Sequence, residues 1–187
     1  MLGKTAAHIF WMFRYLERCE NTARIINASH FISLTQKQNI TNQWDSILNV
    51  GGNKSFFLSK YGEVKKSTVI NFTLRDKTNP SSVLSLIGNA RQNARVVRNN
   101  LTKEVFETIN ETYHILSNIF KRPINEKNLL NTLSIIRTKC QLARGTLHGT
   151  MLRDDTYIFA RMGTFIERAD NTSRILDIKY YVLLPSV

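Results

Sequence analysis

The chain has 187 residues, the size of one ordinary domain and long enough to bury a hydrophobic core. Hydrophobic residues make up 42% of it, which excludes an intrinsically disordered protein. The net charge is +12, but the lysines and arginines are dispersed along the whole chain, so we do not expect nucleic acid as a partner.

The N-terminal apolar run is interrupted by Arg14, which makes it too short and too charged for a signal peptide or a membrane-spanning helix. Cys19 and Cys140 both fall on apolar helical positions. We therefore expect a soluble, cytoplasmic protein in which both thiols are reduced core residues.

The first predicted element is a long helix from about residue 5, with Thr5 as its N-cap, to about residue 34. Its apolar residues recur at three- and four-residue steps, at Ile9, Met12, Leu16, Cys19, Ala23 and Ile26. Phe10 and Phe13 lie on the opposite face, so we expect this helix to be buried on both sides.

Charged and amide side chains share that opposite face, at Arg14, Glu17, Asn21 and Arg24, and Arg18 and Glu20 flank them. Charges in a partly buried position must pair, and Glu20 and Arg24 have the favoured i,i+4 spacing. The spacing also puts Glu17 within reach of Arg14 and of Asn21 on the same helix.

Residues 36–80 show the least regular pattern. A short helix around 43–48 is expected to stop at Gly51 and Gly52, and residues 56–58 to pack from a turn. Apolar and polar residues alternate over 69–74, and several of them are β-branched, which favours a strand locally. A lone strand would have no partner, so we predict a helix there.

Three helices are predicted next. Asn79 would cap the first, whose apolar seam consists of Val83, Ile87, Ala90, Ala94, Val97 and Leu101, with arginines beside it. Thr102 would cap a second helix that ends by Pro123. Asn125 would cap a third that closes near Gly145 and carries the seam Leu129, Leu133, Ile136, Cys140 and Ala143.

A polar loop is expected over residues 145–155. His148, Asp154 and Asp155 match no standard metal-ligand spacing, so we predict no metal site, and acids at a helix start are favourable anyway. The last helix would run from about 155 to 184. Its apolar end, Tyr180 to Leu184, is expected to mediate self-association or pairing with a partner.

The last helix repeats the first. Glu167 lies 150 positions after Glu17, and the same offset aligns a Glu-Arg dipeptide, an acid, Asn-Thr and a final arginine in residues 14–24 and 164–174. A looser third copy lies at 90–95.

These motifs resemble the alpha-E domain family, a bacterial all-helical family named for its Glu-Arg motif. The resemblance begins at 5–18, continues through 79–82, 90–98 and 149–154, and ends at 167–170. Gln92 stands where the family usually has Glu, and Thr164 where it usually has Arg. Because family members usually continue with further helices, we expect a single domain over 1–187 that lacks the C-terminal helices.

We therefore predict an all-α fold, a bundle of about five to seven helices with long first, central and last helices. Three interpretations of the Glu/Arg stripe stay open: an ion-pair network between helices, a pocket for a carboxylate or phosphate group, or ordinary surface charge. The candidate ligand-binding residues are Arg14, Glu17, Arg18, Asn21, Arg24, Arg91, Asn93, Arg95, Arg153, Asp154, Glu167, Arg168, Asn171 and Arg174.

No catalytic motif is recognisable and no cofactor is expected. The resemblance implies association with ATP-grasp enzymes of the glutamate–cysteine ligase-like kind and with transglutaminase-like proteases. We predict a non-catalytic partner or scaffold in such an amide-ligation or peptide-modification system, as a homo-oligomer or with a complementing C-terminal half. The alternatives are an enzyme acting on amide or ester bonds and a basic nucleic-acid-binding bundle.

Overall fold

The computed structural model describes the backbone of residues 1–35 and 40–183, and the side chains of 1–34 and 44–177. The described residues form eight α-helices and one 3₁₀ turn, and they contain no strand. The elements are α1 Gly3–Thr35, α2 Ile40–Val50, α3 Lys54–Tyr61, α4 Lys66–Leu74, α5 Val83–Val96, η1 Arg98–Asn100, α6 Lys103–Ile119, α7 Glu126–Thr150 and α8 Asp155–Leu183.

The all-α prediction is confirmed, with one more helix than expected because residues 40–74 fold into three short helices. The long elements are α1, α7 and α8, whereas the helix that begins at Val83 has only 14 residues. No helix within the described part of the chain combines the length and the apolar character needed to cross a membrane.

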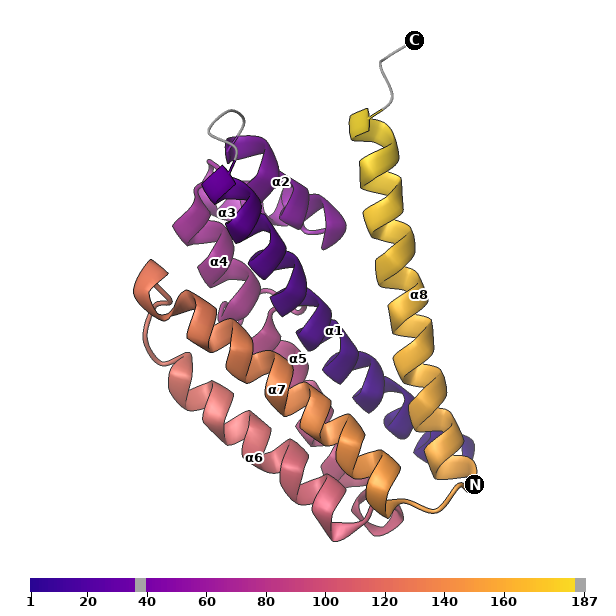
Figure 1. Cartoon of the computed structure of the whole chain (residues 1–187). Helices are drawn as coiled ribbons and strands as arrows, with labels where there is room; N and C mark the ends of the chain where they lie inside the picture. The colour runs from indigo at the N-terminus through magenta and orange to yellow at the C-terminus, as the bar shows by residue number, and fades with distance from the viewer. Residues whose placement is uncertain (36–39, 184–187) are drawn as a thin grey trace.

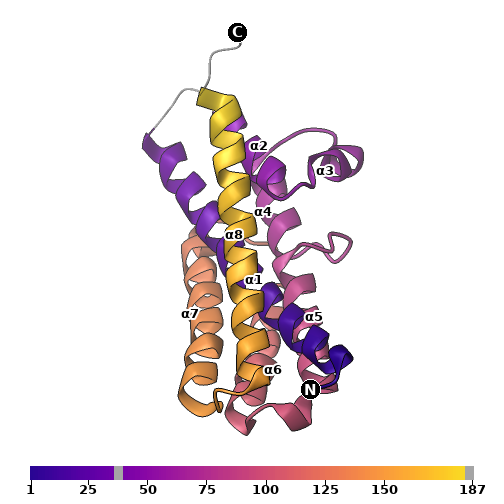
Figure 2. The ribbon, with the colours of Figure 1, turned by 90° about the vertical axis from the view of Figure 1, so that its right-hand side faces the viewer.

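The centre of the molecule is α1, which contacts α2, α5, α7 and α8 (Figure 1). Helices α5 and α7 pack against α1, and α6 packs against both of them, while α2, α3 and α4 gather near the C-terminal end of α1. Helix α8 runs alongside α1 in the same direction (Figure 2). The predicted apolar stripe of α1 is fully buried, from Ile9 to Ile26, which confirms its role in the core.

Side-chain caps fix where several helices begin. Thr102 accepts a hydrogen bond from the backbone N–H of Val105, and Asn125 forms a reciprocal capping box with Asn128, so these two predicted caps are confirmed. The predicted cap at Thr5 is wrong, because α1 already begins at Gly3. The cap of α5 is Ser82, and the prediction of Asn79 is wrong. Asn79 instead accepts from the N–H of Ser81 in the preceding turn, and its buried amide donates to the carbonyl of Phe72.

Burial decides the conformation of residues 66–74. Val69, Ile70, Phe72 and Leu74 are all buried, against neighbours that surround α4. A helix satisfies its backbone hydrogen bonds internally, which a single strand could not do, so the predicted helix is confirmed. The expected turn at 56–58 is wrong: these residues belong to α3, and only Phe57 is buried.

The loop predicted from residue 145 is shorter than expected. Helix α7 continues through Gly145 and Gly149 to Thr150, because Leu147 is buried and anchors its last turns. Cys19 and Cys140 are buried free thiols, as predicted, and burial together with the neighbouring Cys140 raises the pKa of Cys19. The Tyr180–Leu184 cluster lies outside the described side chains.

Candidate functional site

Helices α1 and α8 approach closely at Gly163. A Cβ atom at this position would lie 2.2 Å from the carbonyl oxygen of Phe10, so only glycine allows the two backbones to pack in this way. Because the helices run in the same direction from this crossing, the two copies of the repeated motif lie side by side.

The two Glu-Arg dipeptides exchange partners across that contact. Glu17 accepts hydrogen bonds from Arg168, with Nε 2.8 Å from Oε1 and Nη2 3.3 Å from Oε2. Glu167 accepts from Arg18 through both Nε and Nη2, the latter at 2.8 Å from Oε2. These bonds raise the pKa values of both guanidinium groups. Each glutamate is almost inaccessible, at 3% and 2% exposure, so each buried charge is compensated by the other copy's arginine.

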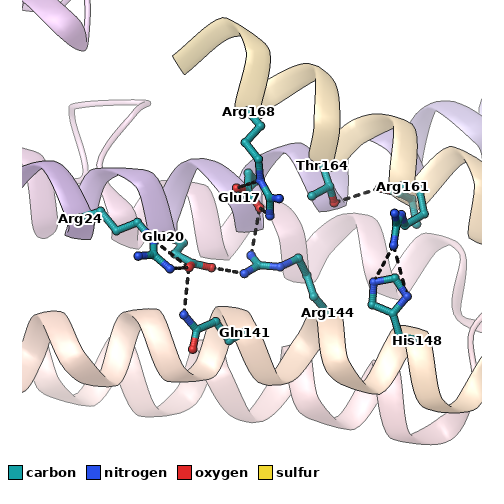
Figure 3. A network of polar contacts seen from close by, with 10 residues as sticks. Glu17, Glu20, Arg24, Gln141, Arg144, His148, Arg161, Thr164 and Arg168 are labelled. Carbon is teal, nitrogen blue, oxygen red and sulfur yellow. Dashed lines mark hydrogen bonds and ion pairs between the residues drawn. The ribbon is translucent and has the colours of Figure 1, made fainter. Parts of the chain in front are cut away.

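Each glutamate also binds a second arginine. Arg14 donates to Glu167 at 2.7 Å and lies 3.9 Å from Asp170. On the other side, Arg144 of α7 donates to Glu17 at 3.0 Å (Figure 3). The repeat offset pairs Arg14 with position 164, which is a threonine in this chain, so Arg144 supplies the charge that the second copy lacks.

Glu20 joins the same network from one turn further along α1. It accepts from Arg24, as predicted, with Nη2 2.6 Å from Oε1, and from Gln141 at 3.1 Å. Its other oxygen lies 2.5 Å from Nη2 of Arg144, which therefore spans two glutamates. Burial acts to raise the pKa of Glu20, but hydrogen bonds from Arg24 and Gln141 and the charge of Arg144 outweigh it and lower the pKa.

The predicted pairs of Glu17 with Arg14 and with Asn21 within α1 are wrong. Glu17 faces α7 and α8, where two guanidinium groups offer several N–H donors to its carboxylate. Charge-assisted hydrogen bonds from two guanidinium groups are stronger than a single side-chain contact between neighbours on one helix surface.

A cavity of about 100 Å³ lies where α1, α2, α4 and α8 come together. Five candidate residues line it, drawn from both copies of the motif: Arg18, Asn21, Glu167, Asn171 and Arg174. Its walls also carry Asn53, Asn79 and Asp170, together with apolar groups from α2 and α4. The Nδ2 atom of Asn21 is buried and has no partner within the described residues.

The structure does not bring the remaining candidates into this cavity. Arg91 donates to Asn110 on α6 at 2.7 Å, and Asn93 lies 3.0 Å from Nδ1 of His8. Arg95 is exposed. Arg153 stacks on the ring of Tyr157, and Asp154 accepts from the backbone N–H of Tyr157 at the start of α8, as expected for an acid at a helix N-terminus.

Sequence reasoning missed Arg144, Gln141 and Asp170 as members of the network. Two features of the sequence could have indicated Arg144. It follows Ala143, which lies on a buried apolar seam, and the second copy of the motif has Thr164 where the first has Arg14, so an arginine from elsewhere is needed. Over the described residues, no three His, Cys, Asp or Glu side chains are grouped to hold a metal ion.

The full length of the chain, residues 1–187, matches the model of Alpha-E, described as a predicted alpha-helical domain with a conserved ER motif. The chain belongs to the Alpha-E family. Searches among curated proteins and solved structures give no match. In this Alpha-E protein the Glu-Arg dipeptides at 17–18 and 167–168 are the groups that exchange partners between α1 and α8.

Proposed function

We propose that this Alpha-E protein is a non-catalytic helical partner in an ATP-grasp-linked amide-ligation or peptide-modification system, and that its motif-lined cavity binds a carboxylate-bearing peptide segment. The observation that carries the binding proposal is the cavity between α1, α2, α4 and α8, which both copies of the Glu-Arg motif line. The choice of ATP-grasp enzymes as partners rests on the family resemblance alone.

The chemistry of the walls favours a peptide. Asn21, Asn53 and Asn171 offer amide groups that can both donate to and accept from a peptide backbone. Arg174 is half-exposed and can bind a carboxylate, while Asp170 can receive an ammonium group. The unpartnered Nδ2 of Asn21 is a buried donor that a ligand carbonyl would satisfy.

The state of the two motif glutamates favours binding over catalysis. Glu17 and Glu167 each accept three hydrogen bonds from two arginines. Their carboxylate oxygens are therefore already occupied, whereas a general base must reach a proton of the substrate. The pairs instead join α1 to α8, two of the helices that form the cavity.

Two measurements test this function. First, the tagged chain should co-purify with an ATP-grasp protein from its own cells at low salt, and the absence of any such complex would contradict the partnership. Second, calorimetry with short peptides should show saturable binding that Arg174→Gln weakens by about tenfold, the effect of losing one charged contact. Among the described residues, the ion pair of Arg174 is with the partly exposed Asp170, so the loss of Arg174 should leave the fold intact.

Arg122→Gln is the matched control, because Arg122 is exposed on the turn between α6 and α7 and is not one of the residues that line the cavity. Peptide affinity that is equal in wild type, Arg174→Gln and Arg122→Gln would refute the assignment of this cavity.

A further inference from the structure

A second cavity, of about 80 Å³, lies between α7 and α8 and has a different chemistry. Three arginines and a histidine line it, together with Thr164 and two apolar residues; the basic groups are Arg144, His148, Arg161 and Arg168. None of its lining residues is shared with the motif-lined cavity, and it has no acidic group in its wall.

The positive charge at this cavity exceeds the negative charge that compensates it. Arg144 and Arg168 both bind Glu17, and Arg144 shares Glu20 with Arg24. Arg161 has no carboxylate within 4.0 Å among the described residues. Its guanidinium instead stacks on Phe165, 4.6 Å from the ring centroid. The site therefore holds an arginine without a counter-ion.

His148 occupies the place where a counter-ion would be expected. Nη1 of Arg161 lies 2.9 Å from Nε2 of His148 (Figure 3). The hydroxyl of Tyr157 lies 2.7 Å from Nδ1 of the same ring. Nη1 of Arg161 and Nη1 of Arg153 also lie 3.5 Å from Nδ1, at the outer limit of a hydrogen bond. Since arginine can only donate, the shorter 2.9 Å contact makes Nε2 the acceptor of a neutral ring, and Nδ1 then donates to the hydroxyl of Tyr157. Burial, with the nearby charges of Arg161, Arg153 and Arg144, lowers the pKa of His148, in agreement with a neutral ring.

The free donors of these arginines point to a ligand. In the described part of the chain, Nε and Nη2 of Arg161 and Nη1 of Arg168 donate no hydrogen bond. Guanidinium groups from two turns of α8 and one of α7 surround a space that can hold a small ion. Several guanidinium groups around one point can each donate to a different oxygen of a tetrahedral anion. A planar carboxylate uses the paired N–H donors of a single guanidinium group.

We propose that the cavity formed by Arg144, His148, Arg161 and Arg168 binds a phosphate-type oxyanion, as inorganic phosphate or as the phosphoryl group of a monoester. The anion lies against Arg161 and supplies the missing negative charge. It competes with His148 for the N–H groups of Arg161, which frees Nε2 of the imidazole to take up a proton. The proposal goes beyond the peptide-binding function and does not depend on it.

The binding test uses the full chain and calorimetric titration with inorganic phosphate at constant ionic strength, balanced with chloride. Saturable binding to one site is expected. Arg161→Gln should weaken it at least about tenfold, since one charge-assisted contact is lost. Arg122→Gln removes the same charge from an exposed position outside the cavity and should leave binding unchanged. Equal affinity in wild type and Arg161→Gln, or no heat beyond that of chloride, would overturn the proposal.

A second readout needs no variant and reports on occupancy directly. The ring nitrogens of His148, followed by NMR between about pH 5 and pH 8, should show a higher pKa when phosphate is present. The groups that face this ring are Arg144, Arg153, Arg161 and Tyr157. An unchanged titration at saturating phosphate would contradict an anion at Arg161.

Glycerol phosphate separates the two sources of the anion. Tighter binding than that of inorganic phosphate assigns the cavity to a monoester, and equal or weaker binding assigns it to free phosphate. Arg174→Gln should not change the affinity for phosphate or for glycerol phosphate, and Arg161→Gln should not change the affinity for peptide. Each proposal can therefore be refuted without affecting the other.

Discussion

The carboxylate of Glu17 on α1 binds the guanidinium of Arg168 on α8, and the chain's other Glu-Arg dipeptide makes the opposite pair between Glu167 and Arg18. The two helices are thus joined by equivalent contacts related by a pseudo-twofold axis along their common direction. Paired charges of this kind fix register, because sliding one helix by a turn would leave a buried carboxylate without a partner.

The exchange predicts strong energetic coupling between Glu17 and Arg168. In a double-mutant cycle with Glu17→Gln and Arg168→Gln, we expect a coupling energy of about 1–3 kcal/mol in the free energy of unfolding. The reason is that Glu17→Gln removes the carboxylate that Arg168 binds, and Arg168→Gln leaves the buried charge of Glu17 with Arg144 alone. Glu63 and Lys65, an exposed pair, serve as the control and should show no measurable coupling. Additive effects at Glu17 and Arg168 would show that the contact does not stabilise the fold. Denaturant unfolding measures both cycles.

The role of Arg144 predicts a rescue. Arg144→Met should lower the free energy of unfolding by about 2–3 kcal/mol, since Glu17 and Glu20 both lose a partner. Adding Thr164→Arg restores the arginine at the position that Arg14 occupies in the first copy. The double variant should therefore unfold at a higher temperature than Arg144→Met alone. A further loss of stability would contradict the equivalence of Arg14 and Arg144.

The close packing at Gly163 predicts that adding one methyl group there strongly lowers the stability of the fold. Gly163→Ala would place a Cβ 2.2 Å from the carbonyl oxygen of Phe10, and backbone cannot move aside as a flexible side chain can. We expect a loss of about 2 kcal/mol or more. Gly145→Ala, on the exposed side of α7 with nothing within 4 Å, is the control and should stabilise the protein by about 0.5–1 kcal/mol. Thermal unfolding of the two variants compares them, and equal melting temperatures would be incompatible with the close crossing.

We expect the ionisation of Glu20 to account for part of the loss of fold stability at low pH. Its pKa in the folded protein is lowered from 4.5, so its ionised form stabilises the fold above about pH 4.5, and this contribution is lost as the pH falls through the folded pKa. Glu20→Gln should therefore show a smaller drop in melting temperature between about pH 5 and pH 3 than wild type. Asp177→Asn, an exposed acid on α8, is the control. An identical drop in wild type and Glu20→Gln would show that Glu20 is not paired in solution.

Local chemistry let the sequence predict much of the fold. The three- and four-residue steps of Ile9, Met12 and Leu16 depend only on helix geometry, and Thr102 and Asn125 cap through bonds to residues three positions away. Asn79 was misjudged because its side chain is used by a buried turn and by Phe72, a contact that no local rule contains.

The sequence by itself determined that the chain is helical, that α1 is buried and that two charged motifs repeat. Only the tertiary structure decided that Glu17 binds Arg168 and Arg144 rather than Arg14, because that choice depends on how α7 and α8 approach α1. It also placed Arg161 beside His148 and away from any described carboxylate. Helix formation is set by bonds between near neighbours in the chain, whereas the pairing of buried charges is set by packing between segments more than a hundred residues apart.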